Sequence, residues 1–153
     1  MDVKFRQATK NDVPSIVQMI ADDKLGKQRE NFQDPLPKEY YTAFESINSD
    51  DNQELIVVEG NDNLILGTFQ LTFIPYLTYR GGVRAQIEAV RIRKDQRGEG
   101  LGQKMMLWAI ERAKERKAHV LQLTTDKKRP EALNFYKKLG FIASHEGMKM
   151  HLK

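Results

Sequence analysis

A glycine-rich segment between a strand-like run and a long amphipathic stretch carries the clearest chemical signal in this chain. It reads Arg-Gly-Glu-Gly-Leu-Gly over residues 97–102. Glycines let the backbone approach a ligand closely, because no Cβ atom stands in the way. A helix is predicted to begin at about Gly100, and its first N–H groups lack acceptors within the helix and lie at the positive end of its dipole. The segment therefore predicts an anion site, most often for phosphate, with the Arg97 guanidinium at its rim.

The spacing of these glycines excludes two common phosphate-binding motifs. A P-loop needs a hydroxyl residue directly after its lysine, and here Met105 follows Lys104. A dinucleotide fingerprint needs a third glycine where this chain has Gln103. The pattern that is present is Arg-x-x-Gly-x-Gly over residues 97–102. A glycine-rich turn that binds no ligand is the alternative interpretation.

A second motif, Ala-x-x-x-Tyr-x-x-x-Gly-Phe, occupies residues 132–141. The two motifs, in this order and spacing over about residues 83–142, resemble the signatures of the GNAT superfamily of N-acetyltransferases. The resemblance implies acetyl-CoA as co-substrate, with its pyrophosphate at the glycine segment and its pantetheine arm against backbone groups of one strand. Many members carry Asn where this chain has Arg129, which could instead hold a cofactor phosphate. The residues assigned to acetyl-CoA in this way are Val90, Ile92, Arg97, Gly98, Glu99, Gly100, Leu101, Gly102, Gln103, Arg129 and Tyr136.

Two further side chains are candidates for catalysis. An amine with a pKa of ~10.4 is almost fully protonated at neutral pH, so its acetylation benefits from a base. Glu88 lies on the strand before the glycine segment, where many family members place their acidic base. Tyr136 carries over from the second motif as the acid that protonates the departing thiolate, and a backbone N–H near Val90 would hold the oxyanion. The structural alternatives are an ion pair of Glu88 with an arginine and packing of Tyr136 beside Ala132.

These residues predict an acetyl-CoA-dependent N-acetyltransferase that acts on a primary amine by direct transfer in a ternary complex. The absence of cysteine removes one covalent route. A non-catalytic acyl-CoA-binding regulatory module is the main alternative, and a structural partner whose glycine turn binds nothing is a third. The acceptor is a small-molecule or peptide amine, and we expect its pocket to involve residues 22–41 and 76–84. A homodimer is left open.

Composition places further limits on the function. The 153 residues, 40% hydrophobic and 30% charged, predict a single globular domain over residues 1–153. The net charge of +4 is modest, so we expect no nucleic-acid partner, and no apolar run is long enough for a membrane span. Without a signal peptide, the expected location is the cytoplasm. The histidines have no metal-binding spacing, and no metal is expected; they are His119, His145 and His151.

Periodicity predicts alternating helices and strands. The expected strands are residues 3–7, 55–59, 67–73, 84–92, 120–124, 141–143 and 148–152. Helices are expected over residues 13–20 and 40–47, from about Gly100 onward, and from Pro130 to a stop at Gly140. An Asn- and Gly-containing turn at residues 60–63 joins two strands. The fold class is therefore α/β, and it matches the GNAT-type mixed, mostly antiparallel central sheet flanked by helices that the resemblance implies.

Overall fold

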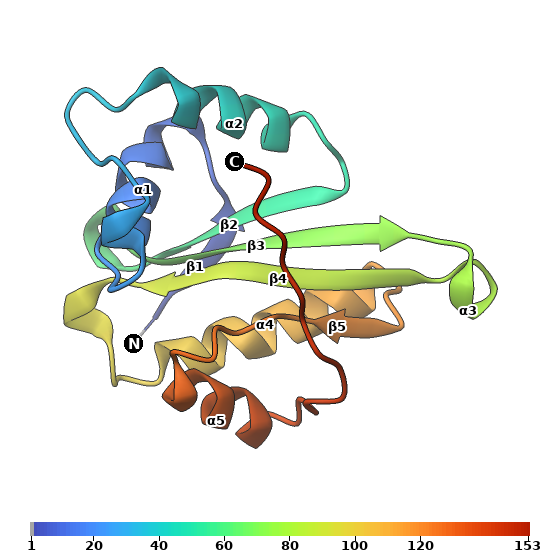
Figure 1. The fold of residues 1–153 in the computed structure, drawn as a ribbon. Helices are drawn as coiled ribbons and strands as arrows, with labels where there is room; N and C mark the ends of the chain where they lie inside the picture. Colours follow the sequence, from blue (N-terminus) through green and yellow to red (C-terminus); the bar gives the residue numbers. More distant parts are fainter. Residues whose placement is uncertain (1) are drawn as a thin grey trace. The chain divides into compact units, whose positions relative to one another are not determined.

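A five-stranded sheet organises residues 2–122 (Figure 1). The strands are β1 (Lys4–Gln7), β2 (Gln53–Glu59), β3 (Ile65–Pro75), β4 (Val83–Ile92) and β5 (Val120–Gln122), side by side in this order. Neighbours from β1 to β4 are antiparallel, and β5 is parallel to β4. The computed structural model describes residues 2–153 and divides the chain into an N-terminal unit, residues 1–122, and a C-terminal unit, residues 123–153. The single domain expected from chain length stays a prediction.

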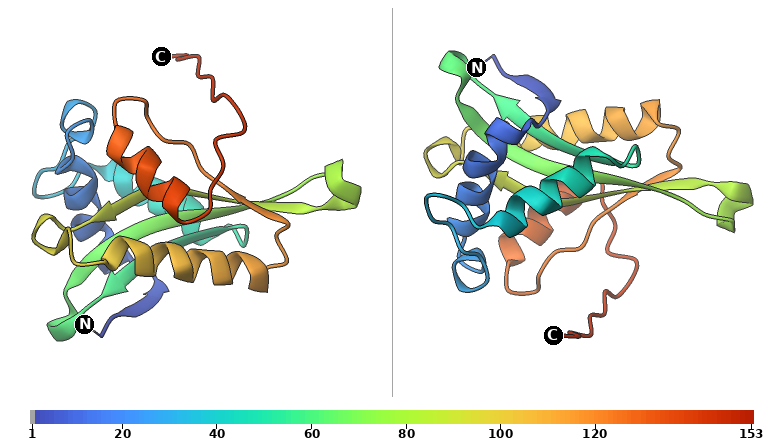
Figure 2. Two further views of the ribbon diagram at one scale, coloured as in Figure 1. Left: turned by 90° about the horizontal axis from the view of Figure 1, so that it is seen from below. Right: turned by 90° about the horizontal axis from the view of Figure 1, so that it is seen from above.

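Helices cover both faces of this sheet (Figures 1 and 2). α1 (Val13–Ala21) and α2 (Lys38–Asn48) lie on one face, and α4 (Leu101–Glu115) lies on the other. Because side chains alternate along a strand, β2 sends Val57 toward α1 and α2 and Ile56 toward α4. On the α4 side, the Phe69 ring packs against Trp108 at a centroid distance of 5.8 Å. The mixed, mostly antiparallel sheet flanked by helices that the sequence predicts is thus confirmed.

Turn residues fix the connections as expected. Asp62 and Asn63 adopt left-handed backbone angles, φ 60° and 59°, in the β2–β3 turn. A short helical turn, α3 (Thr78–Gly81), joins β3 to β4. In the C-terminal unit, α5 (Pro130–Lys138) begins at Pro130, and Gly140 follows its end with φ 102°. Both the proline start and the glycine stop were predicted.

The two closing strands expected at residues 141–143 and 148–152 are wrong: residues 141–153 form neither helix nor strand in the structure. Their alternating apolar side chains are exposed, Met148 by 92% and Leu152 by 88%. An isolated strand is marginal in water, since its backbone groups and apolar face need a partner. Strand β5 also ends two residues earlier than expected, at Gln122.

Candidate functional site

A β-bulge interrupts strand β4 at its centre. Thr68 pairs with Arg91 and Gln70 pairs with Glu88, so the single residue between them on β3 faces both Ala89 and Val90. Ala89 has a left-handed φ of 55°, which is uncommon for a residue with a Cβ atom. Bulges release backbone groups from the regular ladder and are frequent beside active sites. The bulge lies where the sequence predicts a backbone donor for an oxyanion.

Glu88 lies at the start of this bulge and is exposed. It stands opposite Gln70 in the antiparallel pair, so the two side chains share the sheet face covered by α1 and α2. Within residues 2–153 the Glu88 carboxylate makes no ion pair and accepts no hydrogen bond. The arginine ion pair, which was the structural alternative for this residue, is therefore not formed in the structure. The carboxylate is available to a ligand.

The glycine segment follows β4 and leads directly into α4. Gly98 and Gly100 both have φ 80°, and a Cβ atom at either position would meet no atom within 4 Å. Glycine is favoured at both positions because the backbone is left-handed there, and not because neighbouring atoms would collide with a Cβ atom. Gly100 is the N-cap residue and offers no side-chain cap. The first N–H groups of α4, those of Leu101, Gly102 and Gln103, thus point out of the helix without intrahelical acceptors.

Arg97 is exposed but folds back onto the backbone. Its guanidinium approaches the Ile92 carbonyl oxygen at 3.3 Å and the Asp22 carbonyl oxygen at 3.4 Å. Nearby, Arg91 forms an ion pair with Asp23 at 3.7 Å, and it donates to the Val90 carbonyl oxygen at 2.8 Å. These contacts attach the loop after α1 to the end of β4. They hold the bulge and the glycine segment in one region of the N-terminal unit.

The remaining predicted site residues, Arg129 and Tyr136, belong to the C-terminal unit. Arg129 is the N-cap residue of α5. Tyr136 lies on α5, and its ring makes edge contacts with Phe135 and Phe141 at centroid distances of 5.3 and 5.8 Å. The structure therefore groups Glu88, Val90, Ile92 and residues 97–103 in one unit, and it places Arg129 and Tyr136 on one helix of the other.

A second carboxylate on the same sheet, Glu54 of β2, is committed to structure. Its oxygens accept hydrogen bonds from Arg112 at 2.6 and 2.9 Å and from Arg116 at 2.9 Å. Burial alone would raise the pKa of Glu54, but the two guanidinium groups hold that pKa below its usual value. This cluster was not among the sequence-based predictions. Two features of the sequence could have indicated it: the charged Glu54 within an apolar strand, and two arginines four positions apart at the end of a predicted helix.

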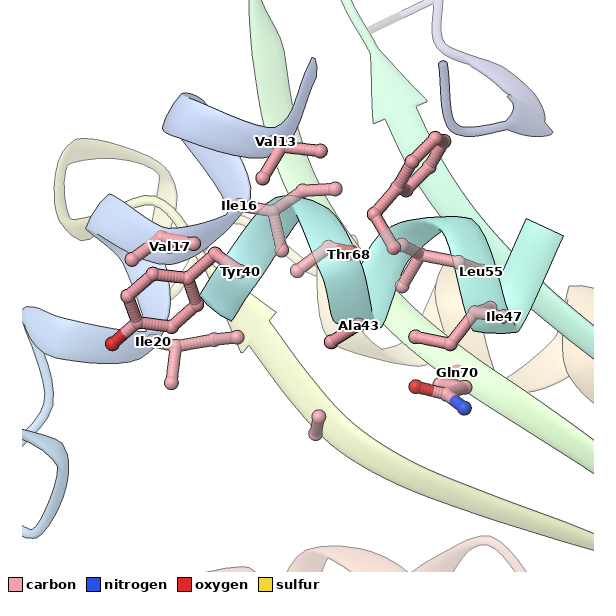
Figure 3. Close-up of a pocket in the computed structure, with 12 residues that line it drawn as sticks. Val13, Ile16, Val17, Ile20, Tyr40, Ala43, Ile47, Leu55, Thr68 and Gln70 are labelled. Atoms are coloured by element: carbon pink, nitrogen blue, oxygen red, sulfur yellow. The ribbon is translucent and has the colours of Figure 1, made fainter. Parts of the chain in front are cut away.

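An apolar cavity of about 120 Å³ lies beside the bulge, between α1, α2 and the sheet (Figure 3). Helix side chains form most of its wall, and Gln70 and Ala89 line it from the strands. The Thr68 hydroxyl, which also lines it, donates to the Ile56 carbonyl oxygen at 2.9 Å. Of the two segments expected to build an acceptor pocket, residues 22–41 contribute Tyr40, and residues 76–84 contribute none of the lining.

Three further features of the described part of the chain concern histidine chemistry, metal-binding clusters and membrane-spanning helices. The His119 ring stacks on Tyr76 and hydrogen-bonds to its hydroxyl group. Residues 2–153 contain no cluster of three or more acidic, cysteine or histidine side chains suited to a metal ion. Of the helices in these residues, none has the length and hydropathy that a transmembrane helix requires.

Comparison with known families gives one match over most of the chain. Residues 20–141 match the model of the acetyltransferase (GNAT) family. The matched residues include the β4 bulge and both motifs, at residues 97–102 and 132–141. None of the curated proteins compared with the chain matches it significantly.

Solved structures resemble the chain over its full length. A transcriptional regulator from Bacillus halodurans C-125 is 54% identical, with a TM-score of 0.95 over 99% of this chain and 100% of that one. A predicted acetyltransferase with acetyl-CoA from Clostridium acetobutylicum is 26% identical, with a TM-score of 0.74 over 99% and 97% of the two chains. Glucosamine-6-phosphate N-acetyltransferase from Arabidopsis thaliana shares the fold at 19% identity, with a TM-score of 0.79 over 100% of both chains.

Proposed function

Since this chain belongs to the acetyltransferase (GNAT) family, we propose that it moves an acetyl group from acetyl-CoA to the nitrogen of a primary amine. The observation that carries this proposal is the sequence of three features along β4 and into α4. The exposed Glu88 carboxylate makes no ion pair within residues 2–153, a β-bulge follows it, and the N-terminus of α4 has no side-chain cap. Direct transfer in a ternary complex is part of this proposal, and the lack of cysteine supports it by removing one covalent route.

The glycine segment is assigned to the pyrophosphate of acetyl-CoA. The first N–H groups of α4 and its positive dipole end suit an anion, and Gly98 and Gly100 bring the backbone into the required conformation. Around this segment, Arg97, Gly98, Glu99, Gly100, Leu101, Gly102 and Gln103 form the binding set. The backbone groups of Val90 and Ile92 are assigned to the pantetheine arm, and Arg129 to a phosphate.

Each chemical step has a candidate group. Glu88 accepts a proton from the ammonium, directly or through water, so that the nitrogen lone pair can attack the thioester carbon. A backbone N–H at the bulge stabilises the resulting oxyanion. When the carbon–sulfur bond breaks, the Tyr136 hydroxyl donates its proton to the CoA thiolate. The nitrogen releases its second proton to solvent, and solvent returns a proton to the Tyr136 phenolate. The products are an amide and CoA.

A non-catalytic acyl-CoA-binding regulatory module is the second candidate function. It is favoured by one observation, that the 54% identical structure is named a transcriptional regulator. Both candidates bind acetyl-CoA, but only the enzyme releases CoA in the presence of an amine. We further propose that the protein acts in the cytoplasm on a small-molecule or peptide amine, without a metal, nucleic acid or membrane. A homodimer, which the sequence leaves open, is not required by this proposal.

Two measurements on the purified protein test these proposals. Acetyl-CoA should raise the melting temperature, because a ligand that binds only the native state stabilises it by mass action. A thiol-release assay with a panel of primary amines should then detect CoA. Stabilisation without thiol release from any amine would favour the regulatory module. If acetyl-CoA leaves the melting temperature unchanged and calorimetry detects no binding, both candidate functions fail.

A further inference from the structure

The cavity beside the β4 bulge points to the chemical class of the acceptor. We infer that the acceptor is a monoamine whose single ammonium group is attached to a compact, uncharged apolar group, and that the apolar group enters this cavity. The inference rests on the proposed amine acetylation and makes it specific. It follows from the lining of the cavity, from the Gln70 amide oxygen and the Glu88 carboxylate at one end of it, and from its volume.

The wall of the cavity is apolar and is supplied by well-packed helices. Ile16 and Val17 of α1 are 5% and 3% exposed, and Phe44 of α2 is 7% exposed. Among residues 2–153, no charged side chain lines the cavity, and the polar side chains that line it are those of Thr68, Gln70 and Tyr40 (Figure 3). The Tyr40 hydroxyl donates outward, to Glu30 at 3.0 Å. A ligand inside the cavity would therefore meet mainly hydrocarbon.

The polar end of the cavity offers side-chain oxygen atoms that can accept hydrogen bonds. The Gln70 side-chain nitrogen donates to the Gln53 side-chain oxygen at 2.8 Å, and Thr72 donates to the same oxygen at 2.8 Å. This arrangement fixes the Gln70 amide and leaves its oxygen accepting no hydrogen bond within residues 2–153. Glu88 stands directly across the strand pair from Gln70. A carbonyl oxygen and a carboxylate side by side suit an ammonium group, which has three donors and no acceptor.

These features also exclude acceptor classes. A second ammonium, a carboxylate or a phosphate carried on the same small molecule would enter hydrocarbon without a partner, and a buried unpaired charge is strongly unfavourable. A sugar would bury hydroxyl groups that the wall does not hydrogen-bond. Diamines, amino acids and aminosugars are therefore poor acceptors for this cavity.

The volume limits the size of the apolar group. A cavity of about 150 Å³ lined by similar side chains takes up benzene. The present one, at about 120 Å³, suits a group of the size of a branched aliphatic side chain. Each further methylene that the cavity buries should raise kcat/KM by about fourfold, the ratio equivalent to ~0.8 kcal/mol.

The test uses matched amines. We expect kcat/KM to rise along ethylamine, propylamine, butylamine and isopentylamine. Putrescine, which adds a second ammonium to the butylamine chain, should be at least tenfold poorer than butylamine. Acetylation of putrescine or of an aminosugar in preference to isopentylamine would overturn the inference while the proposed function stands. If no amine releases CoA, the proposed function fails, and the inference fails with it.

A substitution at the edge of the cavity tests whether the apolar group of the acceptor amine binds there. Ala43 lines the cavity from the exposed part of α2, so Ala43→Leu should narrow it without removing a buried contact. We expect the KM for isopentylamine to rise about tenfold, with the KM for ethylamine and for acetyl-CoA unchanged. Glu45→Leu adds the same side chain to an exposed position of α2 that does not line the cavity, and it should leave all three constants unchanged. Equal effects of the two substitutions, or none from Ala43→Leu, would place the acceptor elsewhere.

Discussion

Two glutamates on one sheet have opposite environments. Glu54 of β2 is 3% exposed and faces α4, where Arg112 and Arg116 satisfy its oxygens. Glu88 of β4 faces the other side, is exposed and has no partner within residues 2–153. The guanidinium groups lower the pKa of Glu54, so this carboxylate does not readily take up a proton. The contacts of Glu54 are structural, and Glu88 stays the proposed general base.

The strongest test of this comparison removes the proton acceptor at Glu88. Glu88→Gln keeps the shape of the side chain, and at neutral pH we expect turnover to fall by about 10²–10⁴-fold, as general base catalysis contributes. At high pH the loss should shrink, because the amine loses its proton unaided. The melting temperature and the affinity for acetyl-CoA should stay close to those of the wild type. A pH–rate profile identical to that of the wild type would remove Glu88 from the mechanism.

Tyr136→Phe tests the acid on the second motif. It removes the hydroxyl and keeps the ring that contacts Phe135 and Phe141. We expect turnover to fall on the order of 10²-fold, with acetyl-CoA affinity within a few-fold, because the hydroxyl acts mainly as charge develops on sulfur. Single-turnover kinetics and calorimetry separate the two quantities. Wild-type turnover would leave Tyr136 as a packing residue.

In contrast to Glu88→Gln, Glu54→Gln should lower the stability of the protein and leave its turnover unchanged. It leaves Arg112 and Arg116 without their anionic partner, and hydrogen bonds to charged groups are worth about 1.5–3 kcal/mol each. Since both arginines are about 30% exposed and can reach water, we expect a loss of only about 2 kcal/mol in the free energy of unfolding. Chemical denaturation measures this loss, and turnover of the folded variant should be unchanged. A variant as stable as the wild type but slower in turnover would contradict the structural assignment of Glu54.

Alanine substitutions at two glycines distinguish the cost of backbone strain from the loss of acetyl-CoA binding. Gly100 and Gly81 have φ 80° and 73° and open space around them, so an alanine at either should cost about 1–2 kcal/mol of stability. Only Gly100→Ala should also weaken acetyl-CoA binding, because Gly81 lies in the β3–β4 connection. Isothermal calorimetry on both variants makes the comparison. Equal affinities would place the pyrophosphate away from the glycine segment.

The contrast between the two glutamates also shows what the sequence could predict. Strand alternation and the glycine segment are local patterns, so β4, the start of α4 at Leu101 and the stop of α5 at Gly140 were found correctly. The partners of Glu54 lie 58 and 62 residues away, and no local pattern joins them. The bulge at Ala89 depends on the register with β3, which a single strand does not specify. The closing strands failed for a related reason: alternation at residues 148–152 predicts a strand only where a partner edge is available.

The smallest expected effect concerns pH, and it again distinguishes the two carboxylates. Arg112 and Arg116 lower the pKa of Glu54 despite its burial. A carboxyl group whose pKa is lower in the folded than in the unfolded protein stabilises the fold above its unfolded pKa, about 4.3 for glutamate. This stabilisation is lost as the pH falls through the folded pKa.

The difference in unfolding free energy between wild type and Glu54→Gln should therefore be constant from pH 7 to about pH 5 and should shrink below about pH 4. Urea midpoints measured across this range follow the difference directly. Glu88→Gln serves as the control variant, because it removes a carboxylate that makes no ion pair within residues 2–153. If the Glu54→Gln difference stays constant into acid, the arginines do not stabilise the ionised carboxylate, and the division of roles between the two glutamates is lost.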